Sequence, residues 1–221
     1  MASLTNAFVR RGRKIIGIGW NYRLHVAELG STLPNKPLFF LKPTSSYVQE
    51  PLPIVIPSEV GSIHHEVELA VVLGRSGKAI PAEKAEDYIA GYAVGIDVTA
   101  RELQTQVRKA GEPWTECKGY DTFTPISNLI SKERVSDRCH LGLWLKVNGM
   151  ERQRTSCSDM IFDVPHLIEH VSRVMTLEEG DVLLTGTPAG VGPLVEGDRV
   201  EAGLTYDQAN LISMAFTVTI D

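Results

Sequence analysis

The chain has 221 residues, of which 43% are hydrophobic and 22% are charged, and its formal net charge is −5 at pH 7. This length and apolar content predict one sizeable core, and therefore one domain rather than two. The negative charge argues against a nucleic-acid partner, and no apolar run approaches the roughly 20 residues of a membrane-spanning helix. Three scattered cysteines, Cys117, Cys139 and Cys157, indicate a reducing intracellular compartment rather than a disulfide framework.

The N-terminal segment ends in the basic run RRGRK at residues 10–14, and no acidic residue precedes Glu28. Such a segment is weakly similar to a mitochondrial presequence. A short basic lead-in is the simpler explanation, because residues 14–19 already have the pattern of a core strand. We therefore expect residues 1–14 to be a lead-in, with a remnant of a targeting segment as the alternative, and a mitochondrial or cytoplasmic location.

The first predicted strand, KIIGIG at residues 14–19, contains two glycines of a dinucleotide-binding fingerprint. Tyr22 stands where the third glycine of that fingerprint would be, so a Rossmann nucleotide site is excluded. The segment NYRLHVAELG that follows predicts a short helix capped by Asn21 and ended by Gly30. Its polarity and flanking glycines are typical of a lid over a site.

His25 and Glu28 lie three residues apart within this predicted helix, so they share one helical face. A carboxylate beside an imidazole orients the ring and raises its basicity, which is the arrangement of a general base. An ordinary surface pair has the same spacing and remains the alternative.

The segment SIHHEVELAVVLG at residues 62–74 is the central predicted strand. With a rise of about 3.3 Å per residue, Glu66 and Glu68 lie on one face, about 6.6 Å apart. Two carboxylates on an otherwise apolar strand repel each other, so a cation is expected between them. An exposed strand face is the alternative. His64 and His65 precede the pair and are either ligands, supporting partners or ordinary packed residues.

A third acidic residue, Asp97, interrupts the apolar predicted strand at residues 91–99. A turn residue or a helix cap is the simple explanation for it. Together with the glutamate pair, it instead suggests oxygen ligands for a hard cation. Because no cysteine or histidine stands at zinc-type spacing, Mg²⁺, Mn²⁺ or Ca²⁺ is expected.

The remaining pattern is that of many short strands with local helices. Residues 112–120, which include Lys118, are predicted as a loop, and Asn148-Gly149 is a strong hairpin signal. The glycine-rich loop at residues 185–193 lacks the motif of a P-loop, but its amides and Thr187 can hold a small anion such as a carboxylate. Strands are predicted at 37–43, 51–57, 141–148, 182–185, 200–203 and 211–220, and helices at 82–90, 100–110 and 164–175.

The motifs HHEVELAVVLG, GYAVGIDVTAREL, LWLKVNG and LLTGTPAGVGP occur in this order between residues 64 and 193. In these motifs the chain resembles the fumarylacetoacetate hydrolase superfamily, and the resemblance extends from about Ile15 to the C-terminus. It implies an α+β, mainly β fold, a mixed β-roll with flanking short helices. It also implies a single catalytic domain over residues 15–221 and a homodimer.

The resemblance further implies a role for each matching site residue. Metal ligands for Mg²⁺ or Mn²⁺ would be Glu66, Glu68 and Asp97; catalytic residues would be His25, Glu28 and Lys118; and substrate-binding residues would be Arg101, Gln104, Thr187 and Lys42. Three positions depart from the family pattern and bear on substrate preference. Trp20 replaces the arginine of a GRNY motif, Cys117 replaces a small residue, and Gly119 stands where serine is common.

The implied function is that of a metal-dependent enzyme acting on small 2-oxo acids through a pyruvate-enolate type intermediate. We favour acylpyruvate hydrolysis or oxaloacetate decarboxylation, with the metal as Lewis acid and Lys118 stabilising the oxyanion. Oxaloacetate enol–keto tautomerisation shares the intermediate and is the closest competing reaction. An isomerase or hydratase of unsaturated 2-oxo diacids is a further candidate, and a β-rich binding module without activity is the candidate outside the enzymes.

Overall fold

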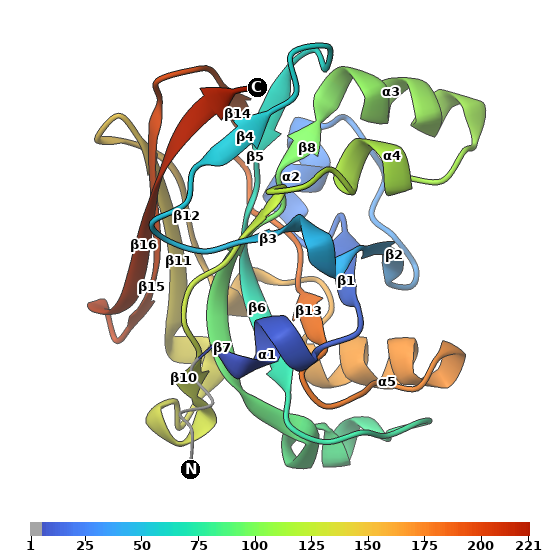
Figure 1. The fold of residues 1–221 in the computed structure, drawn as a ribbon. Coiled ribbons are helices and arrows are strands. Elements are labelled where there is room, and N and C mark those ends of the chain that lie inside the picture. Colours follow the sequence, from blue (N-terminus) through green and yellow to red (C-terminus); the bar gives the residue numbers. More distant parts are fainter. Residues whose placement is uncertain (1–5) are drawn as a thin grey trace.

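The computed structural model describes residues 6–221, so the first five residues of the predicted lead-in lie outside it. Two β-sheets face each other, and most of the helices lie on the far side of the larger sheet (Figure 1). The buried core between the sheets includes Leu69 and Val71 from one sheet and Leu143 and Leu145 from the other. Two buried apolar faces therefore hold the sheets together.

The larger sheet is mixed and has six strands. Only β1 and β13 pair in parallel, and every other neighbouring pair is antiparallel. Strand β6 is buried along its whole length, which explains its continuous apolar sequence. The strands in spatial order are β10 (Ile130–Ser131), β7 (Ile89–Ile96), β6 (Val67–Leu73), β13 (Val182–Leu184), β1 (Ile15–Gly19) and β2 (Leu38–Lys42).

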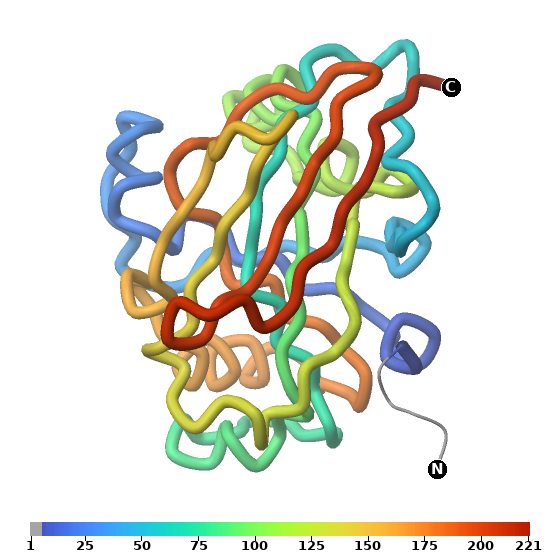
Figure 2. Tube along the Cα trace, turned by 90° about the vertical axis from the view of Figure 1, so that its left-hand side faces the viewer, coloured from blue at the N-terminus to red at the C-terminus, as the bar shows by residue number. Residues whose placement is uncertain are grey.

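The second sheet has five strands, and its long strands lie in front in Figure 2. Asn148 and Gly149 both have positive φ, 53° and 77°, which confirms the predicted tight hairpin. The strands in spatial order are β12 (Met150–Ser156), β11 (Leu141–Val147), β15 (Arg199–Tyr206), β16 (Ala209–Ile220) and β4 (Ile54–Ile56). Two small sheets consist of β14 (Gly192–Leu194), β5 (Ile63–His65) and β8 (Thr99–Ala100), and of β3 (Tyr47–Val48) and β9 (Thr124–Pro125).

The helices are short. Helix α5 begins at the predicted place, with Asp163 as its cap and a proline in its first turn, and α3 ends at Gly111 with a φ of 73°. No helix among residues 6–221 is both long and apolar enough to cross a membrane. The α-helices are α1 (Ala7–Arg11), α2 (Arg23–Glu28), α3 (Arg101–Ala110), α4 (Thr115–Lys118) and α5 (Val164–Val174), and the 3₁₀ helices are Thr44–Ser46, Ala82–Tyr88, Lys132–Arg134, Arg138–His140 and Cys157–Asp159.

Three local predictions were wrong, and a fourth was right about a helix but did not predict its type. The predicted strand at 62–74 breaks at Glu66, because β5 pairs with β14 and β8 while β6 joins the main sheet. The predicted helix at 82–90 is a 3₁₀ helix, and the predicted loop at 112–120 contains α4. Asn21 does not cap α2; its side chain donates to the Thr185 carbonyl and accepts from the Phe162 amide.

The described part of the N-terminal lead-in packs on the sheets. Phe8 of α1 is buried, and the buried Asp181 accepts hydrogen bonds from the backbone amides of Arg13 and Lys14. The Lys14 ammonium also pairs with Asp181 at 2.5 Å. These contacts fix the start of β1 beside β13, and β1 leads directly to α2.

Candidate metal centre and active site

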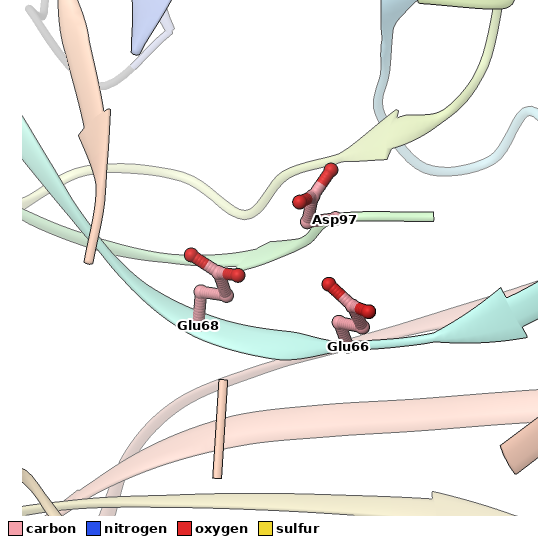
Figure 3. A group of neighbouring side chains, drawn as sticks. All are labelled: Glu66, Glu68 and Asp97. Carbon is pink, nitrogen blue, oxygen red and sulfur yellow. The ribbon is translucent and has the colours of Figure 1, made fainter. Parts of the chain in front are cut away.

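Three buried carboxylates converge where β6 begins and β7 ends. Antiparallel pairing sets Glu68 opposite Gly95, and the Asp97 amide donates to the Glu66 carbonyl at 2.8 Å. One carboxylate oxygen each from Glu66, Glu68 and Asp97 lies within 4.8 Å of the other two, and both glutamate side chains extend to the side on which Asp97 lies (Figure 3). Each residue is at most 5% exposed, so the exposed-face explanation is wrong. The Asp97 carboxylate pairs with Lys42 and Lys118, and Ala100 is the N-cap residue of α3, so Asp97 does not serve as a turn residue or a helix cap.

Three cationic side chains surround this acidic triad (Glu66, Glu68 and Asp97). The Lys118 ammonium, at the end of α4, donates to Glu66 at 2.8 Å and also pairs with Asp97. The Lys42 ammonium contacts Asp97 Oδ1 at 2.5 Å, and the Arg101 guanidinium pairs with Glu66. Buried charges need partners of this kind to offset their desolvation.

Neighbouring positive charges offset the charges of the triad carboxylates unequally. Burial alone would raise the pKa of Glu66, but the charges of Lys118 and Arg101 hold that pKa well below its usual value. Burial and the charges of Asp97 and Glu66 raise the pKa of Glu68 well above its usual value. Among the described residues, its hydrogen-bond donor is the Gly186 amide at 2.6 Å. Glu68 is thus the carboxylate most in need of a further positive charge.

The donor set of the triad fits a divalent cation. Three carboxylates without a sulfur or imidazole donor match the ligand preference of Mg²⁺ or Mn²⁺. His64 and His65 lie outside this donor group. The His65 imidazole is hydrogen-bonded to Gln153 at 2.9 Å, and burial lowers the pKa of His64 to about 4.

His25 and Glu28 form a hydrogen-bonded pair on α2. His25 Nδ1 lies 3.0 Å from Glu28 Oε2, and Glu28 Oε1 accepts from the Gly190 amide at 3.0 Å. The imidazole is only 4% exposed, so the surface-pair explanation is wrong. Because Nδ1 is engaged by Glu28, Nε2 is the ring nitrogen left to exchange a proton.

One pocket brings most of the predicted site residues together. Arg101 and Gln104 are joined by a 2.5 Å hydrogen bond at the start of α3. Lys42 is not part of the pocket lining; it lies behind Asp97 and also donates to the Phe123 carbonyl at 2.7 Å. The predicted site residues that line the pocket are Glu66, Glu68, Asp97, His25, Arg101, Gln104, Lys118 and Thr187.

The three departures from the family pattern have distinct structural settings. Trp20 lines the pocket, whereas Cys117 is buried and its thiol contacts the Trp114 carbonyl at 3.1 Å. Gly119 is dictated by space, since a Cβ there would lie 2.6 Å from the Thr115 carbonyl oxygen. Of the three, Trp20 is the one that presents its side chain to the pocket.

Gln153 is a supporting residue that the sequence did not reveal. It lies on β12 between exposed neighbours, yet it is only 1% exposed. Its carbonyl oxygen accepts from the Val67 amide at 3.0 Å, and its amide nitrogen donates to Thr187 Oγ1 at 2.8 Å. Gln153 therefore ties the start of β6, next to Glu66, to the glycine-rich loop.

We expect Gln153→Leu to lower the free energy of unfolding by about 1–3 kcal/mol, because it leaves the buried Val67 amide without an acceptor. Catalytic activity should fall with it, since Thr187 loses the hydrogen bond from Gln153 and keeps only the one that it donates to the Val67 carbonyl. Arg154→Leu on the same strand is the control; its exposed side chain should contribute no more than about 0.5 kcal/mol. Equal urea midpoints for the two variants would refute this role of Gln153.

Comparison with known proteins agrees with this architecture. A family model described as the fumarylacetoacetate (FAA) hydrolase C-terminal matches residues 14–219. The chain belongs to the fumarylacetoacetate hydrolase family. Its α+β, mainly β fold with flanking short helices is confirmed as the fold of this family.

Two relatives and one solved structure are informative for this member of the fumarylacetoacetate hydrolase family. It is 51% identical over 203 residues to a mitochondrial oxaloacetate tautomerase of Arabidopsis thaliana, covering 92% of this chain and 91% of the relative. It is 49% identical over 201 residues to a mitochondrial oxaloacetate decarboxylase of Dictyostelium discoideum, covering 90% and 92%. Fumarylpyruvate hydrolase from Pseudomonas aeruginosa, solved in complex with Mn²⁺ and pyruvate, superimposes with a TM-score of 0.88 at 34% identity, covering 95% of this chain and 91% of that one.

Proposed function

We propose that this protein is a metal-dependent enzyme that converts oxaloacetate and related small 2-oxo acids through a pyruvate-enolate type intermediate. The observation that carries the proposal is the buried acidic triad, which shares one pocket with Lys118 and the oriented His25. The names of the two relatives support oxaloacetate as substrate. The manganese and pyruvate bound to the Pseudomonas enzyme support Mg²⁺ or Mn²⁺ and a pyruvyl group in this pocket.

Glu66, Glu68 and Asp97 would hold the cation, which supplies Lewis-acid polarisation of a 2-oxo acid when bound. Lys118 places a fixed positive charge beside the triad. Burial by itself would lower the pKa of the Lys118 ammonium, but the negative charges of Asp97 and Glu66 raise that pKa by more. The pKa of Lys118 therefore lies above its usual value, and the ammonium stays protonated. It therefore stabilises negative charge that develops on the substrate oxygen in the low-dielectric pocket.

His25 is the proton carrier of the proposed reaction. Glu28 fixes the orientation of its ring, and the Gly190 amide fixes Glu28 in turn. An oriented imidazole can remove a proton from water that attacks the distal carbonyl of an acylpyruvate. In oxaloacetate decarboxylation the carbon dioxide leaves without such a water, and His25 then protonates C3.

Tautomerisation of oxaloacetate is the second candidate. It requires only proton transfer between the enol oxygen and C3, and a single buried proton carrier such as His25 can perform it. The name of the Arabidopsis relative supports this reaction. Both candidates use the same residues, so the fate of the intermediate distinguishes them.

We further propose a mitochondrial location, because both relatives described above carry that word in their names. Residues 15–221 as the catalytic domain and a homodimer as the assembly also remain proposals. They rest on the family resemblance and on the coverage of residues 14–219 by the family model.

The proposed function is tested with protein stripped by EDTA and reloaded with Mg²⁺ or Mn²⁺. Enol absorbance of oxaloacetate is followed, and pyruvate is quantified in parallel. Metal-dependent pyruvate formation would support decarboxylation, and faster enol loss without pyruvate would support tautomerisation. No metal-dependent change with oxaloacetate or acetylpyruvate would overturn the proposal in favour of an unsaturated-diacid enzyme or a binding module.

A further inference from the structure

One face of helix α3 lines the pocket from the acidic triad outward. Arg101, Gln104, Thr105 and Arg108 occupy this face, with the i, i+3, i+4 and i+7 spacing of a helical stripe. Arg101 and Gln104 bind each other at the triad end. Arg108 lies two turns further, about 10 Å along the helix axis, where it is exposed at the outer end of the pocket.

Arg108 differs from the cations near the triad in lacking a carboxylate partner. Lys42, Lys118 and Arg101 each pair with a triad carboxylate. Within residues 6–221, no acidic side chain lies within ion-pair distance of the Arg108 guanidinium. The positive charge of Arg108 is therefore available to an anion that enters the pocket.

The Arg108 guanidinium is held over an aromatic ring rather than left free. Its Cζ lies 5.6 Å from the centroid of the Trp20 ring, within the range of a cation–π contact. Trp20 packs edge-on against Trp114, with centroids 5.9 Å apart, and Trp114 packs against Phe40 at 5.3 Å. These three rings form an aromatic wall (Phe40, Trp114 and Trp20) along the pocket.

The aromatic wall connects the two charged ends of the pocket. At its inner end, the Lys118 ammonium lies 5.2 Å from the Phe40 ring, beside the triad. At its outer end stands Arg108. A ligand bound at the triad by one end and lying along this wall therefore directs its other end toward Arg108.

The backbone at Trp20 indicates that the position of this ring matters. Its φ is +59°, in the left-handed region that bulky residues rarely adopt. Such strain persists where the surrounding structure and function require it. Here the conformation places the indole in the pocket lining and beneath Arg108.

A purely structural role for Arg108 would be to offset the dipole at the C-terminus of α3. Lys109 occupies the same last turn and offers the same charge, but it does not line the pocket. The dipole therefore does not account for an arginine at position 108 stacked on Trp20. It does make Lys109 a matched control for loss of one positive charge.

We propose that Arg108, positioned by Trp20, is a specificity-determining residue that binds the second carboxylate of a 2-oxo dicarboxylate. This inference rests on the proposed function and adds the class of substrate that the pocket prefers. Oxaloacetate and acetylpyruvate are close isosteres in which a carboxylate oxygen is replaced by a methyl group. Arg108 distinguishes them because only oxaloacetate offers a second carboxylate to the guanidinium fork.

The test compares wild type, Arg108→Gln, Arg108→Lys and Lys109→Gln, each loaded with Mg²⁺. Binding of oxaloacetate and of acetylpyruvate is measured by stopped-flow tryptophan fluorescence before turnover, since Trp20 and Trp114 line the pocket. Arg108→Gln should weaken oxaloacetate binding roughly tenfold and leave acetylpyruvate binding unchanged. Arg108→Lys should lie between wild type and Arg108→Gln, because it keeps the charge but loses the planar fork.

Steady-state rates provide the second readout. In Arg108→Gln the KM for oxaloacetate should rise with little change in kcat, and Lys109→Gln should match wild type for both ligands. Equal weakening of both ligands by Arg108→Gln, or the same loss in Lys109→Gln, would overturn the inference. Binding that shows the expected preference without any turnover would instead contradict the proposed function and leave the role of Arg108 intact.

Discussion

Glu68→Gln is expected to abolish metal binding and catalytic activity together while the protein stays folded. Glu68 is 1% exposed and contributes one of the three converging carboxylates. An amide is a poor ligand for a hard cation in place of a carboxylate, so affinity for Mn²⁺ should fall by more than about 100-fold. Isothermal titration with Mn²⁺ and the oxaloacetate assay measure the two losses in the same preparation.

The stability of metal-free protein provides an independent check on this variant. Burial and the neighbouring charges of Asp97 and Glu66 disfavour the ionised form of Glu68 and raise its pKa. Removing that charge should therefore leave the melting temperature in EDTA unchanged or raise it, while the stabilisation by Mn²⁺ disappears. Glu112→Gln, which neutralises an exposed carboxylate, should behave as wild type in every assay. Full activity of Glu68→Gln in EDTA would refute the metal role.

His25→Asn is expected to reduce catalytic turnover about 10²- to 10⁴-fold and to leave Mn²⁺ affinity unchanged. His25 lines the pocket and is oriented by Glu28, but it is not among the three residues of the triad. The loss should therefore appear in kcat rather than in metal binding. Rates and metal titrations on one preparation separate the two effects.

The chain contains a matched control for His25. His166 and Asp163 form a second histidine–carboxylate pair with the same i,i+3 spacing, 2.6 Å apart, and both side chains are exposed at the start of α5. His166→Asn should have no effect on turnover. If His25→Asn retained wild-type turnover as well, the proton would have to be carried by another group.

The comparison of these two pairs shows what local sequence can and cannot predict. His25–Glu28 and His166–Asp163 have the same spacing, and only burial distinguishes the pair in the pocket from the pair on the surface. Burial depends on which sheets and loops cover the helix. The spacing predicted the His25–Glu28 contact, and the fold decided its significance.

The acidic triad could be predicted from the sequence for a physical reason. Acidic residues within continuous apolar strands require compensation, and that requirement is visible in the sequence between residues 62 and 99. The antiparallel register that brings Asp97 next to Glu66 is a long-range property, as is the break of the predicted strand at Glu66. The alternation of apolar and polar residues along each strand predicted neither this register nor the break at Glu66.

The supporting residues escaped sequence reasoning because their elements are short or polar. Helix α4 spans Thr115–Lys118, less than the length at which helical periodicity becomes visible, yet it positions Lys118 at the triad. Gln153 resembles any outward-facing residue of a polar strand, and Arg108 any basic residue at the end of a helix. Only the tertiary structure brings Lys118 and Arg108 to the pocket lining, and Gln153 into contact with Thr187 of that lining.

The most direct test of the central claim is a manganese anomalous difference map from crystals of the protein grown with Mn²⁺. The account predicts one strong peak per chain, coordinated by carboxylate oxygens of Glu66, Glu68 and Asp97 and lost in Glu68→Gln. A protein that converts oxaloacetate at full rate in EDTA, with no manganese peak at these three residues, would contradict it.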